Sequence, residues 1–326
     1  MNDPSFPHFE RRAACPGCDS IRTETIFRAP LGSGPLFEFL RGYYRPGAIS
    51  QEKLAPASFV LDECLDCSLV FQRYIPDEPF LEEIYERWLN STCHPTKDLM
   101  VADALAHPNQ CRDGHELMAA ASYLGRPLKG LRVLDYGMGW GLWARVAKAL
   151  GCEVYGYDLS ESRRAWAREH GVKVVDTHEF FGLELDFANT EQVFEHLSTP
   201  LADARVLAKA LRPGGILKVA VPRGKDLKRR LAIGDWKAPR NTRRSLNPVH
   251  PLEHLNCWSP RALGVMTDLV GLELVEVPLR SYLSFLKRPW TLSLTDPKQV
   301  AKAFLRPVYN WLNPHQLYRW FRKRLS

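Results

Sequence analysis

One stretch of the chain constrains the fold more than any other. It runs from Leu131 to Leu150 and reads LRVLDYGMGWGLWARVAKAL. The short apolar run predicts a buried strand, and the apolar spacing after the glycines predicts a helix that ends before Gly151. Glycines between a strand and a helix let the backbone approach a ligand closely. The stretch therefore predicts a nucleotide-type binding site.

The residues around these glycines narrow the choice of ligand. The dinucleotide fingerprint G-x-G-x-x-G needs a glycine where Leu142 stands. Asp135 lies just before the loop, and its carboxylate favours a cation and repels a pyrophosphate. The loop thus favours a ligand that carries a positive group and no phosphate. S-adenosylmethionine, with its ammonium and sulfonium groups, has these properties.

A second acidic residue, Asp158, ends the next predicted strand. At that place a carboxylate can accept hydrogen bonds from both hydroxyls of a ribose, and the alternative is an N-cap of the following helix. The segments VLDYGMGWG and YGYDLS together resemble motifs of the class I S-adenosylmethionine-dependent methyltransferases. LDFANTEQVFEHLSTP (185–200) resembles the fourth strand and following loop of that family, and ALRPGGILKVAVP (210–222) resembles its Pro-Gly-Gly turn and fifth strand.

The resemblance extends over residues 130–277 and implies a Rossmann-like α/β sheet, mostly parallel with an antiparallel edge. The alternation of predicted strands and helices from Gly130 favours such a sheet independently, and 272–277 alternates like a half-exposed edge strand. Ligands of such sheets bind outside the carboxyl ends of the strands. The cofactor-binding residues predicted there are Asp135, Gly137, Gly139, Gly141, Asp158, Leu159, Asp176 and Gln192. Asp135 is expected to hold the polar end of the cofactor, and Asp176 either contacts the adenine or caps a loop.

Two segments supply the candidate catalytic residues, Glu195, His196 and His254. Members of the family often carry Glu-His after the fourth strand, and a histidine with a pKa near ~6.5 suits proton removal at neutral pH. Either His196 or His254 is the predicted base, and the alternative is a structural pair. His250 precedes Pro251, which disfavours a helical metal pair with His254.

The N-terminal region contains two C-x-x-C pairs, Cys15/Cys18 and Cys64/Cys67, separated by 45 residues. Each pair can present two thiolates to one tetrahedral ion, so a structural Zn²⁺ site is predicted. The phrase CLDCSLVFQRYIPDEPFLEEIYERW resembles a zinc-ribbon module that precedes many bacterial class I methyltransferases, except that Ser68 stands where that module has glycine.

The net charge of +7 comes from two segments. Residues 223–258 carry nine Lys/Arg against three acids, and 287–326 carry nine against one. The first segment follows the fifth strand and is predicted to be a basic substrate lid, with Arg223, Arg240 and His250 as substrate contacts. The second mixes cations with aromatic residues, which fits docking on the body, a membrane-surface helix or nucleic-acid contact.

The predicted organisation is a zinc-ribbon-like module (1–79), a helical connector (80–129), the methyltransferase domain (130–286) and a basic aromatic helical tail (287–326). No apolar run approaches a transmembrane length and no secretory signal is evident, so a cytoplasmic enzyme is expected. The predicted activity is S-adenosylmethionine-dependent methyl transfer to a small anionic acceptor, such as a nucleotide-linked sugar or glycan precursor. An RNA methyltransferase is the second choice, and a non-catalytic interaction protein is disfavoured because the cofactor glycines and acids are all present. The sequence gives no indication of the oligomeric state.

Overall fold

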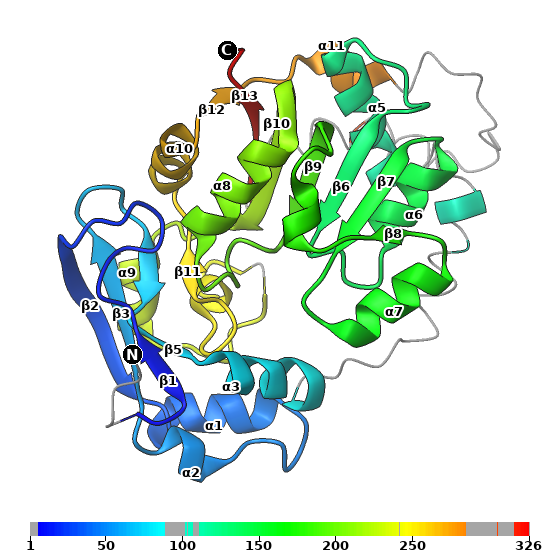
Figure 1. Ribbon diagram of the computed structural model, residues 1–326. Helices are drawn as coiled ribbons and strands as arrows, with labels where there is room; N and C mark the ends of the chain where they lie inside the picture. Colours follow the sequence, from blue (N-terminus) through cyan, green and yellow to red (C-terminus); the bar gives the residue numbers. More distant parts are fainter. Residues whose placement is uncertain are drawn as a thin grey trace.

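The centre of the molecule is a seven-stranded sheet, seen in a computed structural model that describes residues 6–88, 102, 104–106, 111–240, 242–284, 305 and 316–325. The strand order is β12-β13-β10-β9-β6-β7-β8 (Figure 1). The strands are β6 (Arg132–Tyr136), β7 (Glu153–Tyr157), β8 (Lys173–Val174), β9 (Leu185–Glu191), β10 (Leu211–Pro222), β12 (Leu272–Val275) and β13 (Gln316–Lys323). All neighbours from β10 to β8 are parallel, and β13 is antiparallel to both β10 and β12. The predicted mostly parallel sheet with an antiparallel edge is confirmed.

Helices cover both faces of this sheet and bury its apolar strands. Residues of α8 (Pro200–Ala210) and α10 (Pro260–Leu269) form one core cluster with the strands. Residues of α5 (Arg112–Leu124), α6 (Leu142–Ala149) and α7 (Glu161–Glu169) belong to the cluster on the other face. Two short elements, η2 (Thr177–Phe180) and α11 (Leu279–Tyr282), complete this domain. Both faces of the sheet are therefore covered by helices, as is usual for a parallel sheet.

The helical prediction for the C-terminal tail is wrong for 316–323, because this segment is the inner strand β13. Trp320 and Phe321 are 2% and 1% exposed and pack against opposite faces of the sheet. A strand that is apolar on both faces lacks the alternation that identifies a strand in a sequence. The basic end is not free either: Arg322 pairs with Glu273 at 2.5 Å, and Arg324 pairs with Asp268. Apart from Leu305, residues 287–315 lie outside the described part of the chain.

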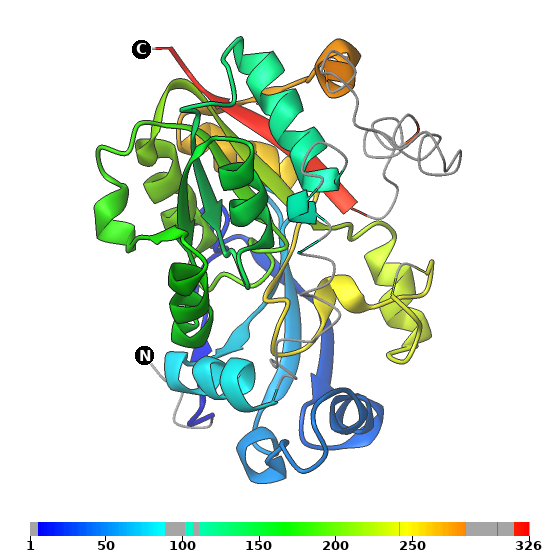
Figure 2. The ribbon, with the colours of Figure 1, turned by 90° about the vertical axis from the view of Figure 1, so that its right-hand side faces the viewer.

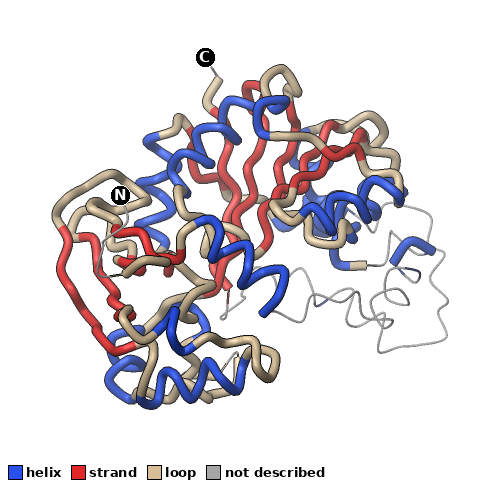
Figure 3. Tube along the Cα trace, turned by 60° about the horizontal axis from the view of Figure 1, so that its bottom comes forward, coloured by secondary structure: helices blue, strands red, loops and turns tan. Residues whose placement is uncertain are grey.

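The N-terminal module contains a four-stranded sheet in the order β11-β4-β3-β2. Figure 3 shows strands (red) that lie apart from the central sheet. The strands of the four-stranded sheet are β2 (Thr23–Pro30), β3 (Ser58–Cys64), β4 (Val70–Gln72) and β11 (Asn256–Cys257), and β1 (Phe9–Arg11) pairs with β5 (Tyr74–Pro76) beside it. The helices are α1 (Gly34–Tyr43), α2 (Gln51–Leu54), α3 (Glu78–Glu83) and the π-helical turn η1 (Ile84–Trp88). The described parts of the segment predicted as a helical connector (80–129) contain η1, α5 and most of α3.

The basic lid at 223–258 is built into this module. Its strand β11 pairs with β4, and its helix α9 (Leu227–Ile233) and turn η3 (Asn247–Val249) carry apolar residues into the core of the module. The buried Arg230 of α9 donates to the Ser245 carbonyl at 2.7 Å and so ties α9 to the segment before η3. Figure 2 shows the lid (yellow-green to yellow) and α1 (blue) on the same side of the molecule. The lid and the N-terminal module thus share one core.

Among the helices of the described residues, none combines the length and the apolar character that a membrane span needs.

Candidate active site

The glycine loop after β6 has the backbone that the sequence predicts. Gly137, Gly139 and Gly141 have φ values of 72°, 55° and 70°, in the left-handed region that glycine adopts without strain. A Cβ on Gly137 would lie 2.5 Å from a methyl group of Val193, whereas a Cβ on Gly139 would meet no atom of the described residues within 4 Å. The loop therefore rests on the segment after β9 at Gly137 and leaves open space at Gly139, where a ligand can contact the backbone.

Asp158 links the end of β7 to this loop. Its carboxylate accepts hydrogen bonds from the backbone N–H of Gly139 at 2.8 Å and of Ser160 at 3.0 Å. Arg163 lies 3.7 Å away. Each carboxylate oxygen keeps a further lone pair, which suits acceptance of ribose hydroxyls. The next side chain, Leu159, is 80% exposed and offers an apolar surface beside that position.

Asp135 lies beneath the loop, where it is 3% exposed. One carboxylate oxygen accepts a hydrogen bond from the backbone N–H of Ala144 in the first turn of α6, at 3.2 Å. The other accepts a hydrogen bond from the side-chain amide of Asn189, at 2.8 Å. Burial raises the pKa of this carboxyl group to about 7, although the Asn189 hydrogen bond opposes the shift. Asp135 therefore fixes the loop against α6, and its predicted contact with the polar end of a cofactor stays a prediction.

Two of the other predicted cofactor residues have clear structural roles. Asp176 precedes η2 and forms an ion pair with Arg164 at 2.6 Å. Its backbone N–H donates a hydrogen bond to the side-chain carboxylate of Glu179, also at 2.6 Å. This arrangement favours the cap over the adenine contact for Asp176. Gln192 has a φ of 57°, and its backbone N–H donates to the Ala220 carbonyl of β10 at 2.8 Å. It turns the chain out of β9 toward Glu195.

A buried polar network behind the loop was not predicted. Lys218 on β10 is 1% exposed, donates to Asn189 at 2.8 Å and to Glu191, and lies 3.3 Å from Glu116. Arg112 at the start of α5 pairs with Glu191 at 2.5 Å. The network connects α5, β9 and β10 to Asp135 through Asn189. The available signal was the single lysine inside the apolar strand ILKVAVP.

The three predicted catalytic residues lie together, and their ligand-type atoms are all within 4.8 Å of one another. The Nδ1 atom of His196 is 2.9 Å from the Glu253 carbonyl oxygen. Because that oxygen can only accept, Nδ1 carries the proton, and Nε2 faces Glu195 at 3.9 Å. Burial lowers the pKa of His196 to about 4, so its ring is neutral at pH 7. The imidazole of His254 lies 4.8 Å from that of His196, between ring centres.

Glu195 is the most unusual member of this group. It is 1% exposed, and neither carboxylate oxygen has a hydrogen-bond partner among the described residues. Burial raises the pKa of this carboxyl group well above its ordinary value, which favours the protonated form. Nδ1 of His254 is buried without a described partner as well. Such unsatisfied groups mark a functional site more often than a structural one, and two imidazoles and a carboxyl group could also hold a metal ion.

The N-terminal module reaches both the catalytic group and the cofactor loop through η1. The hydroxyl of Tyr85 lies 3.0 Å from Nδ1 of His196, and Glu86 accepts a hydrogen bond from Ser160 at 2.7 Å. Arg12, near β1, donates to the Ser198 carbonyl and to the Asn256 side chain, each at 2.8 Å. These contacts position the module over the carboxyl ends of the strands.

A pocket of about 210 Å³ lies between α1 and the lid. Its walls include the aromatic residues Phe39, Tyr43 and Trp236, the cations Lys237 and Arg240, and His250. The structure thus brings two of the predicted substrate contacts, His250 and Arg240, to one place. It does not bring Arg223 there, because Arg223 is not among the residues that line this pocket. The contribution of Phe39 and Tyr43 could not be predicted, because they lie far from the lid in sequence.

The four cysteines of the N-terminal module form one cluster. Sγ of Cys15 is 3.6 Å from that of Cys67, and Sγ of Cys18 is 3.6 Å from that of Cys64. A tetrahedral site with ~2.3 Å zinc–sulfur bonds has sulfurs about 3.8 Å apart, so the donor set fits Zn²⁺. Ser68 adopts a φ of 64°, which explains why glycine is usual at this turn, and the ligand set is unaffected.

With this geometry established, comparison with known proteins identifies the family. Residues 106–277 match the family described as a methyltransferase domain, and the match covers more than half of the chain. The chain belongs to this methyltransferase-domain family.

Its curated relatives are named ubiquinone biosynthesis O-methyltransferases. The protein from Dinoroseobacter shibae is 35% identical over 108 residues, which cover 28% of this chain and 41% of that protein. The protein from Rhizobium leguminosarum bv. trifolii is 30% identical over 202 residues, which cover 58% and 68%. The chain thus spans only about two fifths of the first of these relatives. Among solved structures, an S-adenosylmethionine-dependent methyltransferase from Mesorhizobium loti is 17% identical, with 62% of this chain and 95% of that chain covered and a TM-score of 0.40.

Proposed function

We propose that the protein transfers a methyl group from S-adenosylmethionine to a small anionic acceptor. The open space at Gly139, held next to the carboxylate of Asp158, is the observation that carries this proposal. It provides bare backbone for a cofactor and acceptors for a ribose at the carboxyl end of the sheet. A Cβ at position 139 would occupy the space in which part of the cofactor is proposed to lie. Membership of the methyltransferase-domain family supports the proposal.

S-adenosylmethionine supplies an electrophilic methyl group, so the protein has to position the acceptor and receive a proton if the acceptor is a hydroxyl. Positioning accounts for most of the rate in such a transfer. The names of the curated relatives, O-methyltransferases, favour a hydroxyl acceptor. A base within hydrogen-bond reach of that hydroxyl is then required.

His196 is the proposed base. Its Nδ1–H donates to the Glu253 carbonyl, which leaves Nε2 unprotonated at neutral pH and able to accept a proton. A carboxyl oxygen of Glu195, 3.9 Å from Nε2, is placed to accept a hydrogen bond from the resulting imidazolium and so stabilise it. His254 packs against His196 and orients it. Glu195 and His254 are therefore positioning residues in this proposal.

The charge of the lid supports an anionic acceptor, such as a nucleotide-linked sugar or a glycan precursor. Lys237 and Arg240 line the pocket beside the catalytic group, and no carboxylate is among the described residues that line it. The Cys₄ cluster would hold a structural Zn²⁺, because four thiolates leave no open coordination position. Its role is to hold the module that carries α1 and η1.

Incubation with labelled S-adenosylmethionine and a panel of nucleotide sugars, sugar phosphates, phenolic acids and RNA tests the proposal. Label on a small anion supports it, and label on none of the panel despite cofactor binding contradicts it. RNA is the second candidate, favoured by the exposed lid cations, and it requires affinity that falls steeply with salt. Absence of cofactor binding by calorimetry would instead favour an interaction protein that keeps the fold.

A further inference from the structure

The pocket between α1 and the lid has the composition of a binding site for a ring. Phe39, Tyr43 and Trp236 are only half-buried, although they are aromatic. The ring centres of Phe39 and Trp236 are 6.2 Å apart, and His250 lies 5.2 Å from Phe39 and 4.2 Å from Tyr43. Trp236 is held in place from behind by Phe27 and Phe59 of the module, at 5.9 and 5.8 Å. The walls are thus rigid and apolar, and they leave room for a flat ligand.

The charge of the pocket selects an anion. Nη2 of Arg240 donates to the hydroxyl of Tyr43 at 2.6 Å, which anchors the guanidinium beside the aromatic wall. Among the described residues, only Tyr43 accepts a hydrogen bond from the Arg240 side chain, so its other N–H groups can bind a ligand, and a guanidinium binds carboxylates and phosphates well. Lys237 adds a second positive charge at the same pocket.

His250 adds a specific requirement. Its Nδ1 lies 2.9 Å from the Pro251 carbonyl, so Nδ1 carries the proton and Nε2 is an acceptor. Burial lowers the pKa of His250 to about 3 and keeps the ring neutral. Nε2 is buried and has no hydrogen-bond partner among the described residues, while His250 as a whole is 5% exposed. A buried acceptor without a donor costs free energy, and a hydroxyl group of a ligand would supply the missing donor.

The pocket is connected to the catalytic group. The ring centres of His250 and His254 are 6.1 Å apart, and those of His254 and His196 are 4.8 Å apart. The three imidazoles form a row that leads from the pocket to the segment after β9. Val193 of that segment packs against the glycine loop at Gly137. A ligand ring in the pocket would therefore contact the same group of histidines that contains the proposed base.

We propose that this pocket binds the acceptor through a hydroxylated ring that carries an anionic group, and that the N-terminal module determines which acceptor is used. That the ligand is the methyl acceptor rests on the proposed methyl transfer, whereas its binding in this pocket does not. The proposed pocket also explains the long segment between the two C-x-x-C pairs. This segment contains α1, which supplies Phe39 and Tyr43 to the pocket. A shorter zinc ribbon would lack this wall.

The test measures binding to the full chain by calorimetry in the absence of S-adenosylmethionine. Two probes share the required chemistry, 4-hydroxybenzoate as an aryl carboxylate and glucose 1-phosphate as a sugar phosphate. Phenol and glucose are their uncharged counterparts. We expect one of the anions to bind with millimolar or tighter affinity. Its uncharged counterpart should bind at least about tenfold more weakly, because a hydrogen bond to a charged group contributes at least about a tenfold gain in affinity. The probe that binds identifies the source of the ring.

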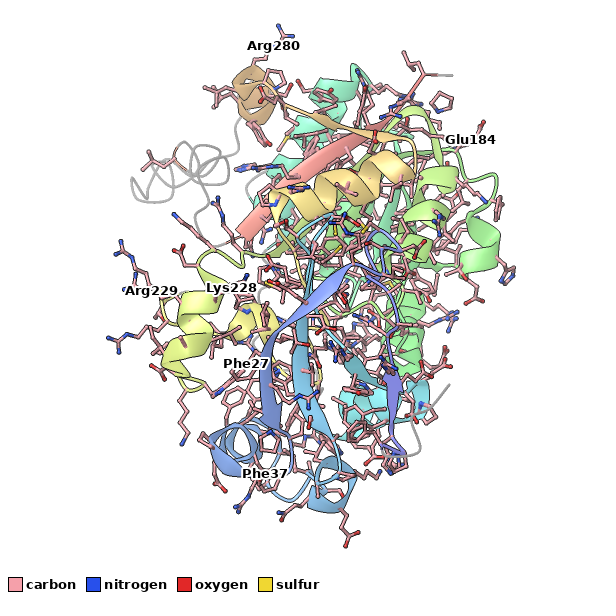
Figure 4. The ribbon with its side chains drawn as sticks, turned by 90° about the vertical axis from the view of Figure 1, so that its left-hand side faces the viewer. Phe27, Phe37, Glu184, Lys228, Arg229 and Arg280 are labelled. Carbon is pink, nitrogen blue, oxygen red and sulfur yellow. The ribbon has the colours of Figure 1, made fainter. Side chains whose placement is uncertain are left out.

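Arg240→Ala locates the site, and Arg229→Ala is its matched control. Arg229 belongs to α9 in the same lid, and its side chain extends away from the body of the protein (Figure 4). Arg240→Ala should weaken the anionic probe at least about tenfold, while Arg229→Ala should leave the affinity unchanged. Equal effects of the two variants would overturn the assignment, because general charge would then explain the binding.

Failure of this inference and failure of the proposed function give different results. If neither anion binds at millimolar concentration while S-adenosylmethionine does, the pocket assignment is wrong and the methyltransferase proposal stands. If an anion binds with the expected Arg240 dependence and S-adenosylmethionine does not, the pocket assignment stands and the methyltransferase proposal fails. His250→Phe, which keeps a ring and removes Nε2, should weaken the hydroxylated probe and leave benzoate unaffected. A loss for both would show that Nε2 is not the acceptor.

Discussion

Substitutions at two glycines of the loop after β6 can distinguish an effect on the stability of the fold from an effect on cofactor binding. Alanine at Gly137 and alanine at Gly139 impose the same left-handed backbone on a residue with a Cβ, at a cost of about 1–2 kcal/mol each. Only at Gly137 does the new Cβ also collide, at 2.5 Å from a Val193 methyl group. Overpacking of this kind costs a further ~1–3 kcal/mol. Gly137→Ala should therefore destabilise the protein by about 2–5 kcal/mol.

Gly139→Ala should have the opposite profile. Its Cβ enters open space, so the free energy of unfolding falls only by the conformational cost of about 1–2 kcal/mol. The same Cβ occupies the space proposed for S-adenosylmethionine, and cofactor affinity should fall by at least about tenfold. Urea unfolding and calorimetry on the two variants measure the two quantities. Unchanged cofactor affinity in Gly139→Ala, or equal loss of stability in both variants, would refute the reasoning.

Four further predictions concern the other parts of the site. Asp158→Ala should weaken S-adenosylmethionine by about tenfold or more in calorimetry, since it removes hydrogen bonds to a charged group; unchanged affinity would remove Asp158 from the ribose role. His196→Gln should lower methyl transfer by about 10²–10⁴-fold without weakening the cofactor, and normal turnover would exclude it as the base. Metal analysis should find about one zinc per chain, lost in Cys67→Ser together with thermal stability; a folded, zinc-free wild type would contradict the site. Burial raises the pKa of Glu253 to about 7, while the Tyr44 hydrogen bond opposes the shift. The folded state therefore holds this proton longer than the unfolded state, and its stabilising contribution, complete below about pH 4, is lost as the pH rises toward 7. Glu253→Gln should reduce that loss by up to about 3 kcal/mol between urea melts at pH 4.5 and pH 8, and an unchanged pH dependence would show that Glu253 does not titrate in this way.

The sequence predicted the part of the fold that depends on local signals. The strands and helices from β6 to β10 follow from apolar runs, glycine turns and spacing that act over a few residues. The glycine loop and Asp158 are predictable for the same reason, because loop and acid lie at the ends of adjacent strands. The prediction also placed Glu195 and His196 correctly after β9. All of these features are separated by short connections in one parallel sheet.

The missed features depend on contacts between distant segments. β13 is an inner strand, and its aromatic residues give no alternation from which to infer it. His196 and His254 were both predicted as candidate bases, but no spacing in the sequence indicates that they meet. The backbone N–H of Asn256, which donates to the Glu195 carbonyl at 3.0 Å, joins the two segments. Tyr43 meets His250 because α1 packs against the lid, and this depends on the shared core of lid and module. Lys218 was overlooked because a buried lysine is tolerated only with carboxylate partners, and those come from α5 and β9.

The inner position of β13 has a consequence for how the chain folds. β10 can pair with β9 as soon as both are made, but its other edge stays bare until residues 316–323 arrive, after the whole lid and α10. Until then β10 presents unpaired backbone groups along an apolar strand, which is a template for association with other chains. A nascent or heated chain should therefore aggregate through this edge, and a peptide with the sequence of 316–323 should suppress that aggregation by occupying it.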